Sequence, residues 1–280
     1  MNDLPRITIV MPSYNQSRYL AEAIQSILEQ NYPDLEFMIL DGESTDGSQE
    51  IIKHYSGHLA YWHSRQDEGQ ADALLQGFSR ATGELMGWLN SDDVLLPGAL
   101  FQIVQAYKSH PNGGIFGGNV LVINEQGNIL RFWRTPSTAG WLARYGWCVI
   151  SQPGSFFTRK AYKAVGGLHR DLHFIMDADL YLRMMKNHSR YVKVDAWVSG
   201  FRLHSSSKTV MGSSNFDIEY ESVRQKYLPW TKHNRVGRYL YIGMQTINGN
   251  YARMVLGNWL ARGKHWQKWC EMNLVMDGKN

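Results

Sequence analysis

The chain has 280 residues, of which 44% are hydrophobic and 19% charged, and its formal net charge is +4. This composition excludes a mainly disordered chain and is typical of a globular protein of one or two domains. Cys148 and Cys270 are the only cysteines, which excludes a disulfide scaffold and a cysteine-based zinc cluster. Two isolated thiols, and a start at residues 1–11 without the pattern of a signal peptide, favour the cytoplasm.

The first 110 residues alternate short apolar runs, which predict buried strands, with segments whose apolar residues repeat at helical spacing. The predicted strands are 7–11, 36–40, 59–63 and 85–89, and helical patterns follow them at 20–28, from 51, at 71–78 and at 97–107. Strand–helix alternation of this kind predicts a parallel sheet with functional sites at the carboxyl ends of its strands.

The pattern changes after Pro111. Segments 115–123 and 129–133 predict a hairpin, 192–203 predicts a later strand, and the chain is helical in pattern from about residue 212. We therefore expect an α/β protein with a mixed sheet flanked by helices and a helical C-terminal extension.

The charge is distributed unevenly along the chain. Residues 231–280 carry eight Lys or Arg and two Asp or Glu, whereas the first 230 residues carry 21 and 23. The basic segment also contains several Trp and Tyr, a composition suited to contact with an anionic bilayer. The alternative is a helical segment that packs on the rest of the protein.

Acidic residues follow three of the predicted strands or helices: Asp41, the pair Asp92 and Asp93, and Asp177 with Asp179. Adjacent carboxylates after a buried strand repel each other unless a cation or a hydrogen-bond donor neutralises them. Oxygen ligands at such a place suit Mg²⁺ or Mn²⁺ together with phosphate oxygens. The alternative is that the 91–93 segment only caps the helix near Pro97.

In this context the chain resembles family 2 glycosyltransferases of the GT-A fold. Five motifs fall in the family's order, and together they cover roughly residues 5–210. They are Ile9 to Asn15 at the first strand, Leu40 to Ser48 at the second, Asp67 to Leu74 on a helix, Trp88 to Asp93, and the later set Gly166–Leu168, Asp177–Leu180 and Arg202–Ser205.

The resemblance implies a nucleotide site at the first strands. It implies that Asp41 accepts a hydrogen bond from the ring N–H of the base, which favours a UDP- or dTDP-sugar, with a GDP-sugar as the alternative. The complete set of nucleotide-binding residues that it implies is Pro12, Ser13, Tyr14, Asn15, Asp41, Gly69, Asn90 and Asp92.

The resemblance also implies a metal site for Mg²⁺ or Mn²⁺. Asp92 corresponds to the ligand of the metal that bridges the two phosphates, with Asp93 beside it as support, and His204 lies where a histidine can complete the metal shell in GT-A enzymes. Many family members have Asp at the first position of this motif, whereas this chain has Asn90. A lone histidine is as often an ordinary hydrogen-bonded residue.

Asp177 is the residue expected to act as the catalytic base. Inverting displacement needs a carboxylate that deprotonates the acceptor hydroxyl, and Asp177 matches the family's catalytic acid. Many members carry Glu-Asp there, whereas this chain has Met176-Asp177. Asp179 is the competitor, and we expect it to be the N-cap of a helix at 180–185.

Other candidates rest on residue type alone. Arg202 and Lys208 could bind a diphosphate through fixed positive charge, or lie on a solvated surface. Trp133, Trp141 and Trp147 could stack on acceptor sugars, or belong to the core.

The resemblance thus predicts an inverting, metal-assisted transferase of surface polysaccharide synthesis whose acceptor is a glycan or a lipid-linked saccharide. We expect a catalytic domain at 1–211, with a nucleotide-binding half (1–110) and an acceptor-side half (111–211), and an extension at 212–280. The protein would be cytoplasmic, with peripheral contact at the inner face of the membrane through 231–280. Nothing in the sequence indicates an oligomeric state.

Two other functions compete with this prediction. A nucleotidyltransferase would share the layout, but 12–16 lacks the glycine and lysine of its phosphate loop. A non-catalytic module that binds nucleotide sugars would be favoured by loss of the acids, yet Asp92 and Asp177 are present. Nucleic-acid binding has no recognisable motif, and we expect none.

Overall fold

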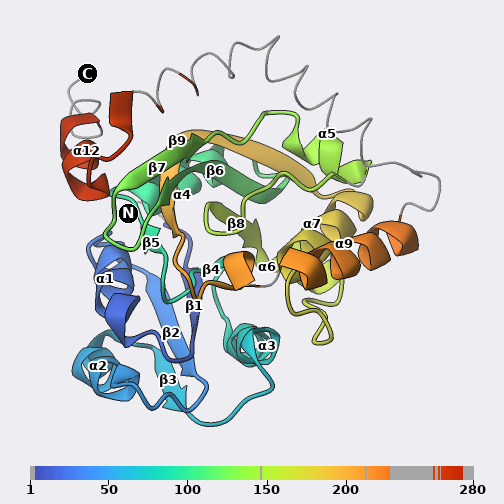
Figure 1. Cartoon of the computed structure of the whole chain (residues 1–280). Helices are drawn as coiled ribbons and strands as arrows, with labels where there is room; N and C mark the ends of the chain where they lie inside the picture. The colour runs from blue at the N-terminus through green and yellow to red at the C-terminus, as the bar shows by residue number, and fades with distance from the viewer. Residues whose placement is uncertain are drawn as a thin grey trace.

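The computed structural model describes residues 4–145, 147–211, 213–227, 255, 258 and 260–273. Over these residues the chain forms one nine-stranded sheet that is covered by helices on both faces (Figure 1). The strands are β1 (Ile7–Ser13), β2 (Leu35–Asp41), β3 (Tyr61–Ser64), β4 (Leu85–Trp88), β5 (Val94–Leu95), β6 (Gly113–Ile123), β7 (Ile129–Trp133), β8 (Ser155–Thr158) and β9 (Arg190–Arg202).

The helices connect these strands and continue beyond β9, so the expected mixed α/β fold with helices after residue 212 is confirmed. They are α1 (Ser17–Leu28), α2 (Ser48–Tyr55), the 3₁₀ turn η1 (Ser56–His58), α3 (Gln70–Arg80), α4 (Ala99–Ser109), α5 (Ala139–Arg144), α6 (Arg159–Ala164), α7 (Met176–Lys186), α8 (Lys208–Met211), α9 (Ser213–Tyr227) and α12 (Trp266–Asn273).

The sheet has the strand order β3-β2-β1-β4-β8-β6-β9-β5. Its first four strands are parallel, as the strand–helix alternation predicts, and so their carboxyl ends lie at one edge. β8 runs antiparallel to both β4 and β6, and β7 pairs antiparallel with the second half of β6. The predicted hairpin is therefore present, inside a mixed sheet.

Both faces of β1 are buried, which explains why its sequence is an apolar run and does not alternate with polar residues. Ile7, Ile9 and Met11 belong to the core beneath α1 and α4, whereas Val10 belongs to the core beneath α3 and α7. A Cβ on Gly77 of α3 would lie 2.5 Å from Val10 Cγ1, so the close approach of this helix to β1 requires glycine there.

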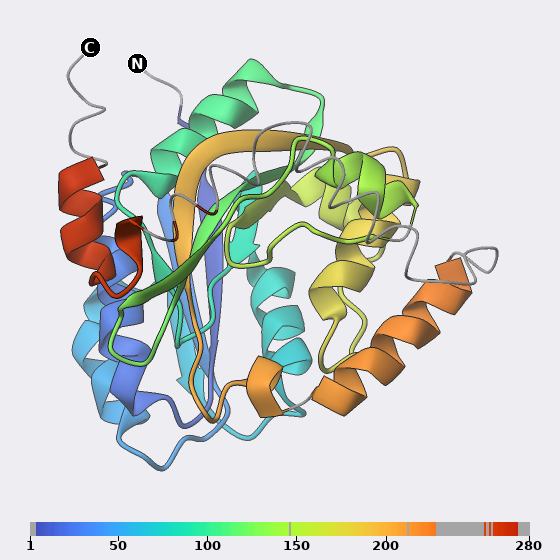
Figure 2. The same ribbon diagram turned by 45° about the horizontal axis from the view of Figure 1, so that its top comes forward.

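The long strand β9 curves across the sheet and ends near the carboxyl ends of the parallel strands (Figure 2). The C-terminal segment packs beside the β6–β7 hairpin: Trp266 and Trp269 are buried there, and Trp266 N donates to Gly127 O at 2.9 Å. These two tryptophans of the basic segment are core residues. The other tryptophans and tyrosines of 231–280 lie outside the described residues.

Among the described residues no helix is long and apolar enough to cross a membrane. The division into 1–110, 111–211 and 212–280 stays a prediction.

Candidate active site

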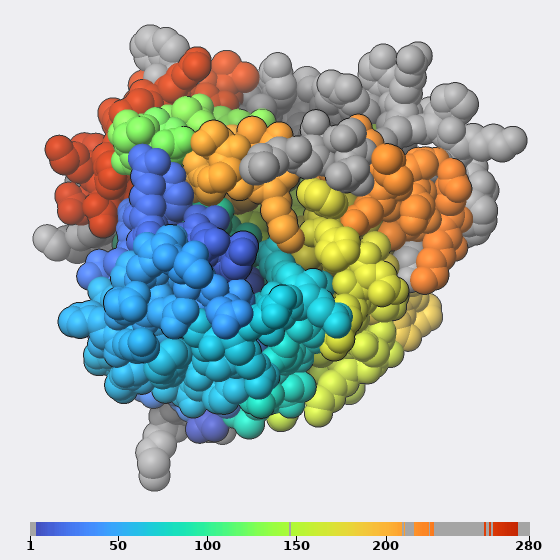
Figure 3. All heavy atoms as spheres, turned by 60° about the horizontal axis from the view of Figure 1, so that its bottom comes forward, coloured from blue at the N-terminus to red at the C-terminus, as the bar shows by residue number. Residues whose placement is uncertain are grey.

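A cavity of about 740 Å³ opens at the carboxyl ends of β1, β2 and β4. Figure 3 shows the hollow between the N-terminal half of the chain (blue and cyan) and the segments around α7, α8 and α9 (yellow and orange). Its walls come from the loops after the three strands, from the segment before α7, and from α8 and α9. Such an edge is where open α/β sheets bind ligands.

The β1 end contributes Pro12, Ser13 and Tyr14 to the cavity wall, and Tyr14 is 64% exposed. Asn15 follows but does not line the cavity. Its backbone lies in the left-handed region at φ 51°, and its side-chain Oδ1 accepts a hydrogen bond from Thr45 N at 3.0 Å. Asn15 therefore fastens the β1 loop to the β2 loop.

Asp41, at the end of β2, is fully buried and does not line the cavity. Its carboxylate accepts hydrogen bonds from Ser44 N at 2.9 Å, from Ser44 Oγ at 2.6 Å and from Ser64 Oγ at 2.6 Å. Three donors on one carboxylate hold the β2 loop in place beneath the wall.

Asp67 is a second carboxylate on this side of the cavity, and it does line the wall together with Gly69. Its Oδ1 accepts from Gly69 N at 2.8 Å, and burial raises the pKa of Asp67. A Cβ on Gly42 would lie 3.2 Å from Asp67 Oδ2 and from a ring carbon of Tyr14. The missing side chain of Gly42 therefore leaves space between Tyr14 and Asp67.

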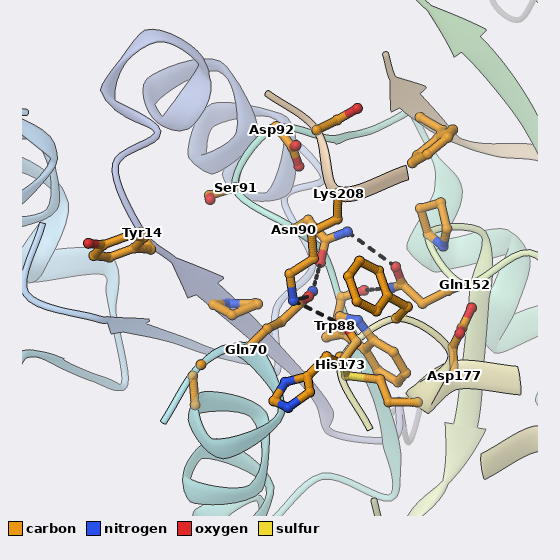
Figure 4. A pocket seen from close by; sticks show the side chains of 18 of the residues that line it. Tyr14, Gln70, Trp88, Asn90, Ser91, Asp92, Gln152, His173, Asp177 and Lys208 are labelled. Atoms are coloured by element: carbon orange, nitrogen blue, oxygen red, sulfur yellow. Dashed lines mark hydrogen bonds between the residues drawn. The ribbon is translucent and has the colours of Figure 1, made fainter. Parts of the chain in front are cut away.

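The loop after β4 carries Asn90, which forms the centre of a polar network in the floor of the cavity (Figure 4). Asn90 Oδ1 accepts from Gln70 Nε2 at 2.7 Å, and Asn90 Nδ2 donates to Asp93 at 3.2 Å and to Gln152 at 3.4 Å. Gln152 in turn donates to Trp88 O at 2.7 Å. An Asp at position 90 could not donate to Asp93, which explains how an amide fits this position.

Asp92 lines the cavity and is paired with His204. His204 Nε2 lies 2.9 Å from Asp92 Oδ2, and His204 Nδ1 lies 2.9 Å from Ser206 Oγ. The His204 side chain is 1% exposed and that of Asp92 is 16% exposed. Of these two residues only Asp92 lines the cavity, and the imidazole of His204 lies behind it. A carboxylate and an imidazole in contact are groups that one divalent cation can share.

The described residues contain no group of three or more His, Cys, Asp or Glu side chains that could hold a metal. Two protein ligands plus diphosphate oxygens suit Mg²⁺ or Mn²⁺, which commonly keep few protein ligands in such sites. The residues at Asp92 and His204 therefore fit the expected ion.

Asp93 is fully buried behind this pair. It accepts hydrogen bonds from Arg202 N at 2.9 Å and from Asn90, and it does not line the cavity. Burial, followed by the charge of Asp92, raises the pKa of Asp93 well above its ordinary value. Asp93 is placed to support the loop from below.

Arg202 does not contact the cavity, and both expectations for it, a diphosphate ligand or a solvated residue, are wrong. It is 2% exposed and bonds to Glu22 at 2.6 Å and to the carbonyl oxygen of Asp92 at 2.8 Å. Glu22 also accepts from Trp266 Nε1 at 2.9 Å, so the guanidinium links helix α1 and the C-terminal segment to the Asp92 loop.

Lys208 does line the cavity. Its ammonium donates to Gln70 Oε1 at 2.9 Å and to His173 O at 3.2 Å, and burial lowers its pKa. These two bonds connect the segment after β9 with both α3 and the residues that precede α7.

Asp177 lies in the first turn of α7 and borders the same cavity, across from Tyr14 (Figure 4). Burial raises the pKa of Asp177 to about 6. The backbone N–H groups of Ala178 and of Asp177 itself bond to this carboxylate, and in the described part of the chain no side chain donates a hydrogen bond to it.

Asp179 is not the helix N-cap that we expected, because α7 begins at Met176 with Ile175 as its N-cap residue. Asp179 is 1% exposed and forms an i,i+4 ion pair with Arg183 at 2.6 Å. His169 Nδ1 lies 3.1 Å from the same Asp179 oxygen. Two residues apart on a helix, Asp177 and Asp179 point in different directions. Asp179 therefore has a structural role, as predicted, but it acts through an ion pair and not as a helix cap.

Of the three tryptophans considered for acceptor stacking, Trp133 lines the cavity and Trp141 and Trp147 do not. Trp141 is 46% exposed and packs against Tyr145. The aromatic residues of the wall that the sequence did not single out are Trp88, Phe174, Phe201, Phe216 and Tyr220.

Polar residues of the site that sequence reasoning missed include Gln70, Gln152 and Glu219. Gln70 lies inside the quoted 67–74 motif, so that motif could have identified it. Gln152 and Glu219 reach the site from irregular or distant segments, 62 and 44–46 residues from their partners, and no local pattern marks them.

Comparison with known proteins gives one family. The sequence profile described as "Glycosyl transferase family 2" matches residues 8–166. EpsE of Bacillus subtilis (strain 168) is 26% identical over 275 residues, which cover 92% of this chain and 94% of that protein.

Two solved structures share the fold at low identity. The mannosyltransferase PcManGT from Pyrobaculum calidifontis, solved with GDP-Man and Mn²⁺, has a TM-score of 0.59 at 18% identity, over 97% of this chain and 84% of that chain. S. aureus TarS 1–349 with UDP-GlcNAc has a TM-score of 0.60 at 13% identity, over 80% of this chain and 71% of that chain.

Proposed function

The chain belongs to glycosyl transferase family 2, and on this premise we propose that it moves a sugar from a nucleoside diphosphate onto a hydroxyl group of a glycan or lipid-linked saccharide. The observation that carries the proposal is the position of Asp177: a desolvated carboxylate, with no described side-chain donor, that borders the cavity also lined by the β1 and β4 loops. The product would belong to surface polysaccharide synthesis.

Asp177 is the proposed general base. With a pKa of about 6 it is mostly ionised at neutral pH and yet basic enough to take the proton of an attacking hydroxyl. The hydroxyl oxygen then attacks the anomeric carbon while the nucleoside diphosphate leaves from the opposite side, which inverts the configuration. Burial raises this pKa because it removes water that would otherwise solvate the charged carboxylate.

The proposed donor site extends from Tyr14 to Lys208. Pro12, Ser13 and Tyr14 would contact the nucleoside, with Asn15 holding their loop. Lys208 would attract the diphosphate, since its ammonium lies in the wall.

The resemblance implies that Asp41 reads the base, but Asp41 lies behind the cavity wall, so we propose that Asp67, which lines the wall, is the carboxylate that contacts the base. Asp41 already accepts three hydrogen bonds, whereas Asp67 lines the wall and has one described donor, Gly69 N. A carboxylate suits the ring N–H of uracil, thymine or guanine, so the site is compatible with UDP-, dTDP- and GDP-sugars. Both kinds of nucleotide occur among the structural neighbours, since TarS was solved with UDP-GlcNAc and PcManGT with GDP-Man.

Asp92 and His204 would hold the Mg²⁺ or Mn²⁺, with Asp93 and Asn90 supporting the loop. When bound, the ion would neutralise charge that develops on the leaving diphosphate. These residues would hold one carboxylate in the cavity wall and one imidazole behind it: Asp92 is held through its carbonyl oxygen by Arg202, and His204 by Ser206.

Peripheral membrane contact through 231–280 stays part of the proposal, but it cannot use Trp266 or Trp269, which are buried. Replacement of Lys232, Arg235 and Arg238 by Ala, which leaves α12 intact, should reduce flotation with phosphatidylglycerol vesicles and leave binding to phosphatidylcholine vesicles unchanged. Equal flotation of both proteins would remove the basic segment from membrane contact.

A donor screen tests the proposed function. Purified protein is incubated with Mn²⁺ or Mg²⁺ and a panel of UDP-, dTDP- and GDP-sugars, and slow release of nucleotide is measured. We expect hydrolysis of one donor by the wild type, no metal-stimulated donor binding by Asp92→Ala, and turnover about 10²-fold lower in Asp177→Asn with near-normal donor binding. Wild-type turnover by Asp177→Asn would refute the assignment of the base.

A further inference from the structure

Helix α7, which carries Asp177, begins without a cap of its own. Its N-cap residue is Ile175, whose side chain cannot accept a hydrogen bond. The first backbone N–H groups of a helix and those just before it need acceptors, and a partial positive charge gathers there. The residues immediately before α7 therefore need a partner from elsewhere in the chain.

Glu219 supplies that partner from α9, more than forty residues later. Its carboxylate accepts hydrogen bonds from the backbone N–H of His173 at 3.0 and 3.2 Å, of Phe174 at 2.8 Å and of Ile175 at 3.3 Å. Three consecutive N–H groups are thus bound by one side chain. An anion at this end of a helix is also favoured by the helix dipole.

The inner face of α9 brings Glu219 to this position. Phe216, Glu219, Tyr220 and Val223 follow the i, i+3, i+4, i+7 spacing of one helix face. Val223 is 4% exposed within the core that contains α7, and Phe216 and Tyr220 line the cavity. The same face therefore anchors α9, borders the cavity and presents the carboxylate.

Lys208 binds the same segment from α8. Its ammonium donates to His173 O at 3.2 Å, while Glu219 accepts from His173 N, so both polar groups of this peptide residue are held by the chain after β9. The segment 173–175 ends two residues before Asp177. The position of segment 173–175 therefore determines where the first turn of α7 begins.

We propose that Glu219 is a positioning residue that fixes the first turn of α7 and so places the Asp177 carboxylate against the acceptor hydroxyl. The inference rests on the proposed base role of Asp177. It also makes α9, which lies beyond the matched 8–166 segment, part of the catalytic apparatus. A bound acceptor that contacts Phe216 or Tyr220 would press on the helix that holds the base in place.

Glu219→Ala tests the proposal in the full chain, with Asp217→Ala as the matched control. Asp217 is an exposed acid on the same helix, and in the described structure it makes no hydrogen bond to 173–175. Turnover with the donor that the wild type hydrolyses should fall about tenfold or more in Glu219→Ala, because small displacements of a reacting group are costly. Donor KM should stay close to that of the wild type and the melting temperature should fall by a few degrees at most, as for the loss of one helix cap. Glu219→Gln, which keeps one acceptor oxygen, should recover part of the loss.

Hydrogen exchange gives a readout that needs no substrate. Amides 173–175 should exchange faster in Glu219→Ala and at the wild-type rate in Asp217→Ala. Unchanged protection of these amides in Glu219→Ala would overturn the proposal, as would a rise in donor KM with turnover unaffected.

The double variant Asp177→Asn/Glu219→Ala separates this inference from the proposed function. If Glu219 acts through Asp177, the double variant turns over no more slowly than Asp177→Asn alone. Additive losses would overturn the positioning role. Wild-type turnover by Asp177→Asn would refute the base assignment itself, whereas a slow Asp177→Asn beside a Glu219→Ala of wild-type turnover would overturn only the present inference.

Discussion

The substitution Asp177→Asn should make the protein more stable at neutral pH while it removes activity. Burial raises the pKa of Asp177 from 3.8 to about 6, so the folded state disfavours the charged form that the proposed mechanism uses. At about 1.4 kcal/mol per pKa unit this shift corresponds to about 3 kcal/mol. Because the carboxylate borders a cavity that water enters, we discount the gain in unfolding free energy to about 2 kcal/mol.

The pH dependence of this gain has a definite sign. Between pH 4 and 6 the unfolded chain releases the proton of Asp177 before the folded chain does, so the stability of the wild type falls as pH rises through this window. Asparagine has no proton to release. The advantage of Asp177→Asn should therefore be full at pH 7.5 and shrink to about 1 kcal/mol or less at pH 4.5.

Asp179→Asn is the matched control, and it should act in the opposite direction. Asp179 is buried in an ion pair with Arg183, and removal of one partner leaves the other uncompensated, at a cost of about 3 kcal/mol or more. Two equivalent substitutions, two residues apart on the same helix turn, should thus change stability with opposite signs.

Thermal unfolding at pH 7.5 and pH 4.5 measures both effects. For a chain of this size, about 2 kcal/mol corresponds to a rise in melting temperature of about 3 °C. The reasoning fails if Asp177→Asn melts at or below the wild-type temperature at pH 7.5. It fails equally if the stabilisation is the same at both pH values, because the titration of Asp177 would then not be its cause.

Three further outcomes follow from the site. Wild-type turnover should fall about tenfold per pH unit below pH 6, since protonated Asp177 cannot accept a proton; initial rates between pH 5 and 8 test this, and a flat profile would contradict it. His204→Ala should weaken Mn²⁺ binding about tenfold or more, as measured by paramagnetic resonance titration; unchanged affinity would remove the histidine from the metal site. Arg202→Lys should lower metal affinity and melting temperature together, because lysine cannot bond at once to Glu22 and to the Asp92 carbonyl; a variant with both unchanged would show that the Asp92 loop holds its own shape.

The sequence predicts the parts of this protein that depend on local pattern. Apolar runs buried on both faces, such as residues 7–11, identify the parallel strands, and the motif around Asn90 to Asp93 identifies the loop at the carboxyl end of β4. Because parallel strands end at one edge of a sheet, the same patterns predict that the β1 and β4 loops lie together. These predictions succeed because the burial pattern of a strand is local and because a helix that connects two neighbouring strands makes them parallel.

Contacts between distant segments could not be predicted in this way. Arg202 bonds to Glu22 across 180 positions, and nothing in the residues around it distinguishes a buried guanidinium from a solvated one. The prediction from the sequence starts α7 too late, after Asp179, because the side chain of Asp179 is of a type that can cap a helix. The acceptor that binds the segment before this helix is Glu219, which only the packing of α9 brings near.

What distinguishes the acidic residues of this site is their set of partners. Asp41 and Asp93 accept hydrogen bonds from neighbouring backbone and side-chain donors, and Asp179 is bound by Arg183, so these three carboxylates have lone pairs already committed to the fold. Asp177 has no such side-chain donor in the described structure, and Asp92 is shared only with an imidazole that can itself bind a metal. Both roles need an ionised carboxylate, but a proton acceptor also needs a raised pKa, which desolvation supplies, whereas a metal ligand needs a neighbouring group that can share the cation. The roles proposed for Asp92 and Asp177 therefore follow from opposite surroundings within one cavity, and exchanging those surroundings, rather than the residues, would exchange the roles.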